Sequence, residues 1–211
     1  KKLEPSDEVF PDVTGGYILK IDRSDEMGWF SHLPGHSSTN AKFYYQYIYP
    51  RDIDINASQK TYIQGFMSNF EIMMNSAGYA DVNSGYPSMI DVPSFVDYFI
   101  INELSKNVDA YKLSTYLYKD NIDQGGKLFI GPVWDYDIAW HNCNYGWSFD
   151  PTGWAYQLQV DDYPSPTWWI KLMSDPGFVN KVYCRWKELR GHVLNIDRLN
   201  AYIDSSVAVI A

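Results

Sequence analysis

The sequence predicts a mixed α+β fold that is mainly helical, with a small N-terminal sheet and a β-hairpin that carries an acidic site. Two observations support this: apolar residues recur at helical spacing in several long segments, and short strand-like runs lie near the N-terminus and on both sides of a polar stretch. With 211 residues, 45% of them hydrophobic, the chain can bury a core as a single domain. We expect a strand-rich edge at 1–56 and a helical lobe with the hairpin at 57–211.

The N-terminal part is predicted to form a strand in YILKID, followed by the strand and helix around residues 47–63. Residues 50–56 (PRDIDIN) are predicted to be a loop, and the helix is predicted to span Ala57 to Ser76. Its apolar stripe is Tyr62, Phe66, Phe70 and Met73. Glu71 lies beside this stripe, and a surface position explains it without a function.

A second helix is predicted from Ser94 to Asp109, with Ser94 as its cap and Asp97 three residues later in a capping-box arrangement. Phe95, Phe99, Ile100 and Leu104 recur at helical spacing and give this helix one apolar face. Glu103 follows this face, and we expect it to be an ordinary exposed helix carboxylate.

A hairpin follows this helix. The run from Thr115 to Lys119 is strand-like, and Asp120 to Gly126 (DNIDQGG) is typical of a turn. From Lys127 onward the chain is predicted to lead into a second strand that includes Gly131 to Trp140. Alternation along that strand would turn Asp135 and Asp137 toward the same side. Because an uncompensated carboxylate costs several kcal/mol to bury, the pair suggests a hard cation such as magnesium. The alternative is a strand end at the surface with two solvated aspartates.

The C-terminal part is predicted to be helical. Ser165-Pro166 and Asp175-Pro176 each resemble the start of a helix, with a capping side chain followed by proline in the first turn. Asn195 is predicted to cap a last helix that runs through Tyr202. Between the hairpin and these helices, residues 142–164 form a long, aromatic and irregular segment, and loops of this length are often functional.

Asp109 precedes Asp135 by 26 residues, with the hairpin between them. A catalytic-loop aspartate, a hairpin and then a metal-binding aspartate is the order of parts in protein kinases. The chain resembles the spore coat protein H (CotH) kinase family, an atypical branch of the protein-kinase-like fold. The resemblance is carried by residues 94–120, by GPVWDYDIAWHNCNYG at 131–146 and by DPGFVNKVYCRWKELR at 175–190, with a weaker match at 15–23 and 47–63.

The resemblance implies binding of ATP with Mg²⁺ and transfer of phosphate to Ser or Thr of partner proteins. Asp109 then matches the catalytic-loop aspartate, which accepts the proton of the attacking hydroxyl, and Asp135 matches the metal-binding aspartate. Asp137 would help to hold the metal and the nucleotide, or would orient the loop. Ordinary kinases have an asparagine five residues after the catalytic aspartate, whereas this chain has Ser114 in the corresponding cofactor-binding position, which argues against two-metal chemistry.

The chain departs from the kinase pattern because it contains no GxGxxG and no GxxxxGK[ST] motif. Lys20 lies after the position of the family's nucleotide lysine, so it does not take that role. We expect the nucleotide lobe to lie N-terminal to Lys1 and these residues alone to be inactive. The competing interpretation is a surface or coat interaction module that keeps the fold without using ATP. A glycosidase is a weaker alternative, because its two carboxylates flank a bond from opposite sides.

The net charge of −9 argues against a nucleic-acid partner, which would require Lys and Arg clusters. An acidic surface favours a basic, Ser-rich protein substrate. In a kinase-like lobe this substrate would lie along residues 142–164, and its expected surface contacts are Trp147, Trp154, Asp161 and Asp162.

The high aromatic content, 17%, favours an extracellular or cell-envelope location, and no apolar run is long enough to span a membrane. Cys143 and Cys184 either pair in an oxidising compartment or remain two thiols. The histidines, including His32 and His36, do not have zinc-site spacing.

Overall fold

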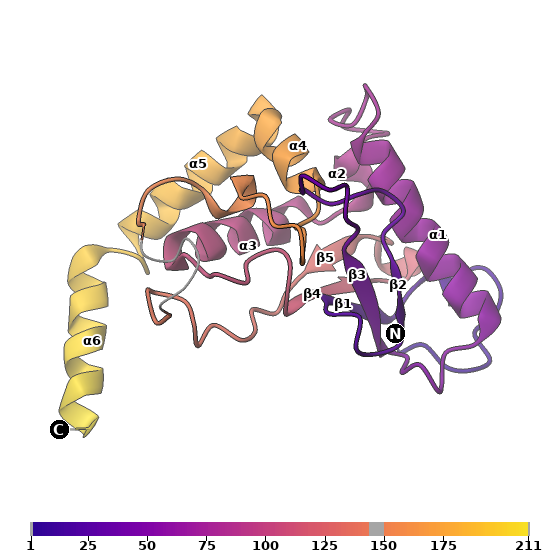
Figure 1. Ribbon diagram of the computed structural model, residues 1–211, viewed down its shortest axis with the longest axis horizontal. Helices are drawn as coiled ribbons and strands as arrows, with labels where there is room; N and C mark the ends of the chain where they lie inside the picture. Colours follow the sequence, from indigo (N-terminus) through magenta and orange to yellow (C-terminus); the bar gives the residue numbers. More distant parts are fainter. Residues whose placement is uncertain (1, 144–149, 211) are drawn as a thin grey trace.

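The computed structural model, shown in Figure 1, describes residues 2–143 and 150–210. Within these ranges the strands form one antiparallel sheet in the order β2-β3-β1-β4-β5. The strands are β1 (Tyr17–Asp22), β2 (Gly28–Phe30), β3 (Tyr44–Tyr49), β4 (Thr115–Lys119) and β5 (Leu128–Ile130). Because β1 pairs with both β3 and β4, the N-terminal strands and the hairpin belong to the same sheet.

Helices supply the other layer, so the predicted mixed α+β fold is confirmed. They are α1 (Ala57–Met74), α2 (Tyr86–Met89), α3 (Val92–Ser105), α4 (Trp168–Ser174), α5 (Pro176–Gly191) and α6 (Ile196–Ile210), with short 3-10 turns η1 (Asp12–Thr14), η2 (Ile122–Gln124) and η3 (Ala155–Gln157). Figure 1 shows α6 extending away from the rest of the molecule.

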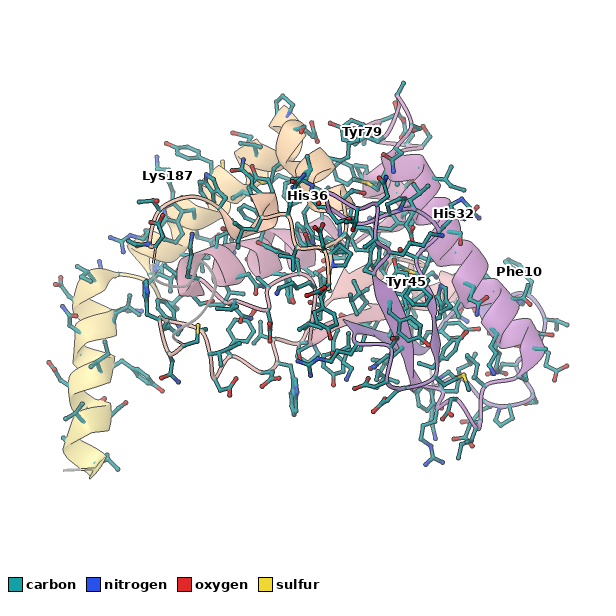
Figure 2. All side chains as sticks on the ribbon, in the orientation of Figure 1. Phe10, His32, His36, Tyr45, Tyr79 and Lys187 are labelled. Carbon is teal, nitrogen blue, oxygen red and sulfur yellow. The ribbon has the colours of Figure 1, made fainter. Side chains whose placement is uncertain are left out.

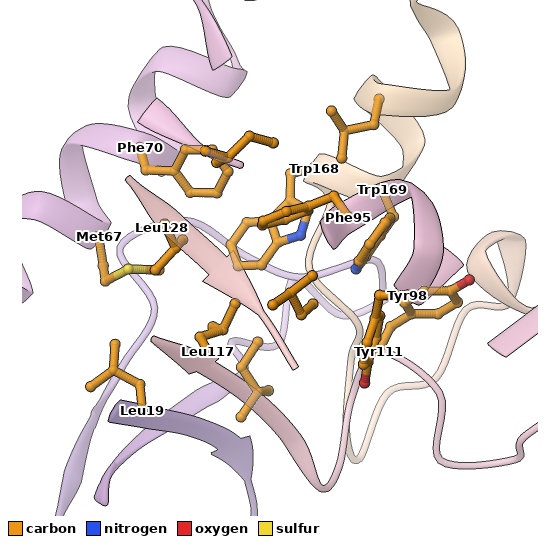
Figure 3. Packing of buried hydrophobic residues seen from close by; sticks show 14 of the residues in the cluster. Leu19, Met67, Phe70, Phe95, Tyr98, Tyr111, Leu117, Leu128, Trp168 and Trp169 are labelled. Atoms are coloured by element: carbon orange, nitrogen blue, oxygen red, sulfur yellow. The ribbon is translucent and has the colours of Figure 1, made fainter. Parts of the chain in front are cut away.

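The core lies between one face of the sheet and the helices. Alternate residues of β1 and β4, such as Leu19 and Leu117, are fully buried on this face. They point toward α1 and α4, and Figure 3 shows Phe70 and Trp168 in this layer. Trp169 is also fully buried. The residues that alternate with the buried ones in β1, including Lys20, lie on the opposite face of the sheet.

The helix α3 differs from the prediction at both ends. Its cap is Asp91, whose Oδ1 accepts a hydrogen bond from the Ser94 backbone N–H at 2.9 Å, so Ser94 lies inside the first turn. Asp97 is not part of a capping box, because its carboxylate binds Arg185 of α5 at 2.8 Å. At the other end Lys106 adopts a left-handed conformation with φ of 51°, which ends the helix before Asp109.

The predicted strand over Gly131 to Trp140 is wrong, because β5 ends at Ile130. Gly131 still donates its N–H to Tyr116 O at 2.9 Å, but its φ of 127° turns the backbone out of the sheet. Pro132 has no N–H to continue the ladder. The alternation argument therefore does not apply to Asp135 and Asp137.

The stripe predicted for α1 is displaced by one position at most of its residues. Phe70 is fully buried as expected, but the other deeply buried side chains are Ile63, Met67 and Met74. Tyr62, Phe66 and Met73 are only partly buried and pack at the margin of the core.

Glu71 is not a surface residue, since only 4% of it is exposed. Its carboxylate accepts hydrogen bonds from the Leu33 N–H at 2.8 Å and the Tyr45 hydroxyl at 3.0 Å. Burial raises the pKa of Glu71 to about 7, although these hydrogen bonds act in the opposite direction. Glu71 therefore links the loop after β2, and Tyr45 of β3, to α1. Figure 2 labels Tyr45 and His32 in this region.

The C-terminal helices were predicted in part. Asp175 caps α5 by accepting from the backbone N–H groups of Gly177 and Phe178, as expected. The cap of α4 is Thr167 rather than Ser165, and α6 continues past Tyr202 to Ile210. No helix within residues 2–143 and 150–210 combines the length and the apolar character that a membrane crossing requires.

Candidate active site

The candidate site lies where three segments meet: the end of β1, the connection from α3 to β4, and the segment after β5. The connection turns sharply, with positive φ at Tyr111 (70°) and Ser114 (49°). Asp135, in the third segment, also has a positive φ of 61°. Non-glycine residues rarely adopt this conformation, and such residues are often found at functional sites.

Asp109 is held by its own backbone turn. Its N–H donates to Asn107 Oδ1 at 3.2 Å, and its C=O accepts from the Leu113 N–H at 3.1 Å. Burial raises the pKa of the Asp109 carboxyl, the positive charges of Lys112 and Arg23 lower it, and the carboxylates of Asp135 and Asp22 raise it again. Asp109, Asp135 and Asp22 therefore lie close enough to interact electrostatically.

Ser114 links two of these carboxylates. Its hydroxyl donates to Asp135 Oδ2 at 3.2 Å, and its backbone N–H donates to Asp22 Oδ2 at 3.3 Å. Asp22 also pairs with Lys20 Nζ at 3.1 Å. The position predicted to contribute to cofactor binding is thus in direct contact with the principal metal-binding candidate.

No side-chain contact joins Asp137 to this group within the described residues. Its side chain is exposed, and its backbone C=O accepts from Asn142 Nδ2 at 2.5 Å. Between the two aspartates, Tyr136 turns inward to Asn102 and Asn107, and its burial raises the pKa of its hydroxyl. The inward position of Tyr136, rather than a strand, leaves Asp135 and Asp137 exposed.

The donor set suits a hard divalent ion, because it consists of carboxylate and hydroxyl oxygens. Among the described residues, no group of three or more His, Cys, Asp and Glu side chains is close enough together to enclose a metal ion. Mg²⁺ is commonly held by one or two carboxylates together with substrate phosphates, so a complete protein cage is not required. The residues present therefore fit a metal that is bound jointly with a nucleotide.

Sequence reasoning missed three charged residues at this site: Asp22, Arg23 and Lys112. Lys112 Nζ lies 3.9 Å from Asp109 Oδ1. Asp22 ends β1 and Arg23 follows it, far from Asp109 in the chain, and the pairing of β1 with β4 brings them there. The signal available in the sequence was the position of Lys112 three residues after Asp109.

Glu103 is not an ordinary exposed carboxylate. It accepts hydrogen bonds from the Tyr111 hydroxyl at 2.8 Å, the Ala155 N–H at 2.8 Å and the Tyr156 N–H at 3.0 Å. Burial raises its pKa, and these hydrogen bonds lower it. Glu103 thus joins the Asp109 segment to η3.

The expected substrate segment is ordered by contacts in its described part. Lys106 Nζ donates to Thr152 O at 2.6 Å and to Gly153 O at 2.9 Å. Trp154 is half exposed and stacks on Phe99, and Asp161 accepts from Ser38 N–H and Oγ. Trp147 lies outside the described residues. The contact roles of Trp154, Asp161 and Asp162 stay predictions.

The cysteines and histidines form no further site in the parts of the chain that the structure describes. Cys143 and Cys184 are not joined by a disulfide. His36 contacts the Gln157 C=O at 3.1 Å, and Figure 2 shows it apart from His32.

Comparison with known proteins gives one match. The family model for CotH kinase protein matches residues 4–211, nearly the whole chain. No curated protein and no solved structure matches. Membership implies a kinase-like function, with ATP and a divalent metal in general and a protein as substrate. This chain therefore belongs to the CotH kinase protein family.

Proposed function

We propose that this chain carries the catalytic carboxylates of an ATP- and Mg²⁺-dependent protein kinase that phosphorylates Ser or Thr of a secreted or coat-type protein. The observation that supports it best is the joint position of Asp109 and Asp135. They are far apart in the chain, yet their charges interact, and Ser114 bonds directly to Asp135. This arrangement suits phosphoryl transfer, where catalysis is mostly positioning and charge stabilisation.

Asp109 is the proton acceptor in this proposal. A partly buried carboxylate with a raised pKa is a better base than a solvated one. Lys112 and Arg23 favour that ionised form. The acceptor hydroxyl would donate its hydrogen bond to Asp109 and lose its proton to that carboxylate as the phosphoryl group is transferred.

Asp135 is the principal metal ligand in this proposal, with Ser114 and Asp137 as further oxygen donors toward the metal and nucleotide. Mg²⁺ bound with ATP would neutralise charge on the phosphates. Asp135 and Asp137 are both exposed, so neither needs to be uncovered before binding. Asp137 would act from the margin, since no side-chain contact joins it to Ser114 in the described residues.

The substrate we propose is a basic, Ser-rich protein, because the chain has a net charge of −9. An extracellular or cell-envelope location agrees with the high aromatic content. Comparing phosphorylation of basic and acidic Ser-containing peptides tests this choice, and equal rates would remove it.

A second candidate is a non-catalytic interaction module. The observation that favours it is that Ser114 replaces the kinase asparagine and already donates its hydroxyl to Asp135, while no glycine-rich phosphate loop occurs in the sequence. In that case the acidic group would be a structural remnant, and nucleotide would not bind.

The test is phosphate transfer from ATP to acceptor protein, with the complete reading frame expressed. Asp109→Asn removes the base with little change in shape, and we expect transfer to fall by about 10²–10⁴-fold. The matched control is Asp123→Asn, an exposed aspartate in the hairpin turn, which should keep wild-type activity. Full activity of a folded Asp109→Asn protein would contradict the assignment.

A further inference from the structure

A small cavity of about 50 Å³ is lined by Arg23 and by Lys112, whose Nζ lies 3.9 Å from Asp109 Oδ1. Positive side chains from three separate segments line it: Arg23 after β1, Lys42 before β3, and Lys112. The rest of the lining is mixed, with the aromatic residues Phe30 and Tyr163 beside charged and hydroxyl groups. The proposed phosphoryl transfer places no ligand in this cavity, although Lys112 and Arg23 also favour the ionised form of Asp109.

These cations make few close ion pairs, although Arg23 acts on Asp109 and Lys42 acts on Glu71 at longer range. Lys112 is largely buried, with 13% of its side chain exposed, and its ion-pair partner, Asp109, lies 3.9 Å away. Arg23 and Lys42 have no carboxylate within 4.0 Å in the described part of the chain. The Arg23 guanidinium lies over the Tyr163 ring instead, 5.7 Å from its centre.

Arg23 and Lys112 also repel each other. Both line the same cavity, and the Lys112 side chain is largely buried there. Holding two cations near each other at a partly buried position is unfavourable unless an anion relieves it. Three cations from separate segments therefore converge on one cavity, where an anion would reduce their mutual repulsion.

Two carboxylates also line the cavity, but neither cancels the three cations. Asp22 is already bound to Lys20 at 3.1 Å and to the Ser114 N–H at 3.3 Å. Asp162 is exposed to solvent. An incoming anion would thus meet hydrogen-bond donors from Arg23, Lys42 and Lys112. The remaining carboxylate, Asp162, lies at the solvent-exposed margin of the cavity.

The size of the cavity restricts the ligand. A volume of about 50 Å³ holds a few water molecules, so it can admit a group of the size of a phosphoryl group but not a nucleotide. Guanidinium and ammonium groups together are well suited to phosphate oxygens.

We propose that this cavity binds the phosphoryl group of a phosphoserine or phosphothreonine that the acceptor protein already carries near its target hydroxyl. The inference rests on the proposed function for its choice of a peptide ligand, because the cavity adjoins the aspartate that would receive the acceptor proton. This proposal is compatible with a basic acceptor protein. The negative net charge of this protein attracts the basic acceptor, and the cavity recognises one phosphorylated side chain on that acceptor. Earlier phosphorylation of a Ser-rich segment would then promote the next event.

The experiment measures peptide binding without nucleotide, so its result does not depend on phosphoryl transfer. The probes are fluorescent Ser-containing peptides with one phosphoserine, or with serine or aspartate at the same place, and anisotropy gives each Kd. We expect the phosphoserine peptide to bind at least about tenfold more tightly than the serine peptide. Equal Kd values would overturn the proposal.

A charge-matched pair of variants locates the effect. Arg23→Gln/Lys42→Gln removes two exposed cations of the cavity and should abolish the preference for phosphoserine. Lys181→Gln/Lys187→Gln removes two cations from α5 and should keep it; Figure 2 shows Lys187 far from the sheet. Equal loss in both variants would mean that overall charge, not the cavity, is responsible, and would overturn the proposal.

Inorganic phosphate distinguishes the source of the phosphoryl group. We expect it to displace the phosphoserine peptide only at concentrations far above the peptide Kd. Displacement at a concentration as low as that of a competing phosphoserine peptide would show a site for free phosphate, and would overturn the assignment to an acceptor protein. Loss of transfer in the Asp109→Asn assay tests the kinase proposal separately.

Discussion

Replacing Glu71 with glutamine should remove a large pH dependence from the stability of this protein. The folded-state pKa of Glu71 is about 7, against an ordinary value of 4.5. The folded protein therefore binds this proton more tightly than the unfolded chain does. The stability contributed by neutral Glu71 is fully present below about pH 4.5 and is lost as pH rises through about 7. With about 1.4 kcal/mol for each pH unit between the two pKa values, the loss is about 3 kcal/mol.

Glu71→Gln keeps the shape of the side chain. Its carbonyl oxygen can accept from the Leu33 N–H, and its amide can donate to the Tyr45 hydroxyl oxygen. The assay is urea unfolding of wild type and variant from pH 5 to pH 8, and the difference between them cancels the other titrating groups. We expect the variant to gain about 2.5 kcal/mol relative to wild type over this range, because part of the full difference falls below pH 5. The exposed Glu26→Gln is the control. Parallel pH profiles for Glu71→Gln and wild type would refute the reasoning.

Three further changes have defined outcomes. Trp169→Ala empties a fully buried site in the core and should lower the free energy of unfolding by about 3–5 kcal/mol, measured by urea titration; a loss below about 1 kcal/mol would contradict this packing. Asp91→Ala removes the cap of α3 and should lower the same quantity by about 1 kcal/mol, whereas no change would mean that Asp91 is not the cap. Glu103→Gln places an amide N–H against the Ala155 N–H and should lower the free energy of unfolding by about 1–3 kcal/mol. A thermal melt should then show a lower melting temperature, and an unchanged melting temperature would contradict this role.

Elements with a strong local signal could be predicted from the sequence. The strand Thr115–Lys119, the turn after it and the Asp175 cap of α5 all occur as expected. In each case the deciding interaction lies within a few residues along the chain. Asp109 and Asp135 were also identified from sequence, although their roles as base and metal ligand stay proposals.

The errors came where distant residues decide the structure. Glu71 and Glu103 were both expected at the surface, and both expectations were wrong because their hydrogen-bond donors lie in other segments. The donors are Leu33 and Tyr45 for Glu71, and Tyr111, Ala155 and Tyr156 for Glu103. Helical periodicity alone cannot show such donors.

The predicted strand over 131–140 was wrong for a local reason, although the sequence pattern there suggested a strand. Proline at 132 cannot donate to the sheet, and Gly131 turns the chain away. Arg23 and Lys112 were missed because only the pairing of β1 with β4 brings them together beside Asp109.

The most direct test of the central claim is the Kd for ATP with and without Mg²⁺, measured with the complete reading frame expressed, for wild type and for Asp135→Ala. We predict that Mg²⁺ tightens ATP binding to wild type and that Asp135→Ala weakens the Mg²⁺-dependent binding by about tenfold or more. The exposed Asp123→Ala should behave as wild type. If ATP binds neither protein, or binds both equally with and without Mg²⁺, the acidic group around Asp135 is not a nucleotide-metal site.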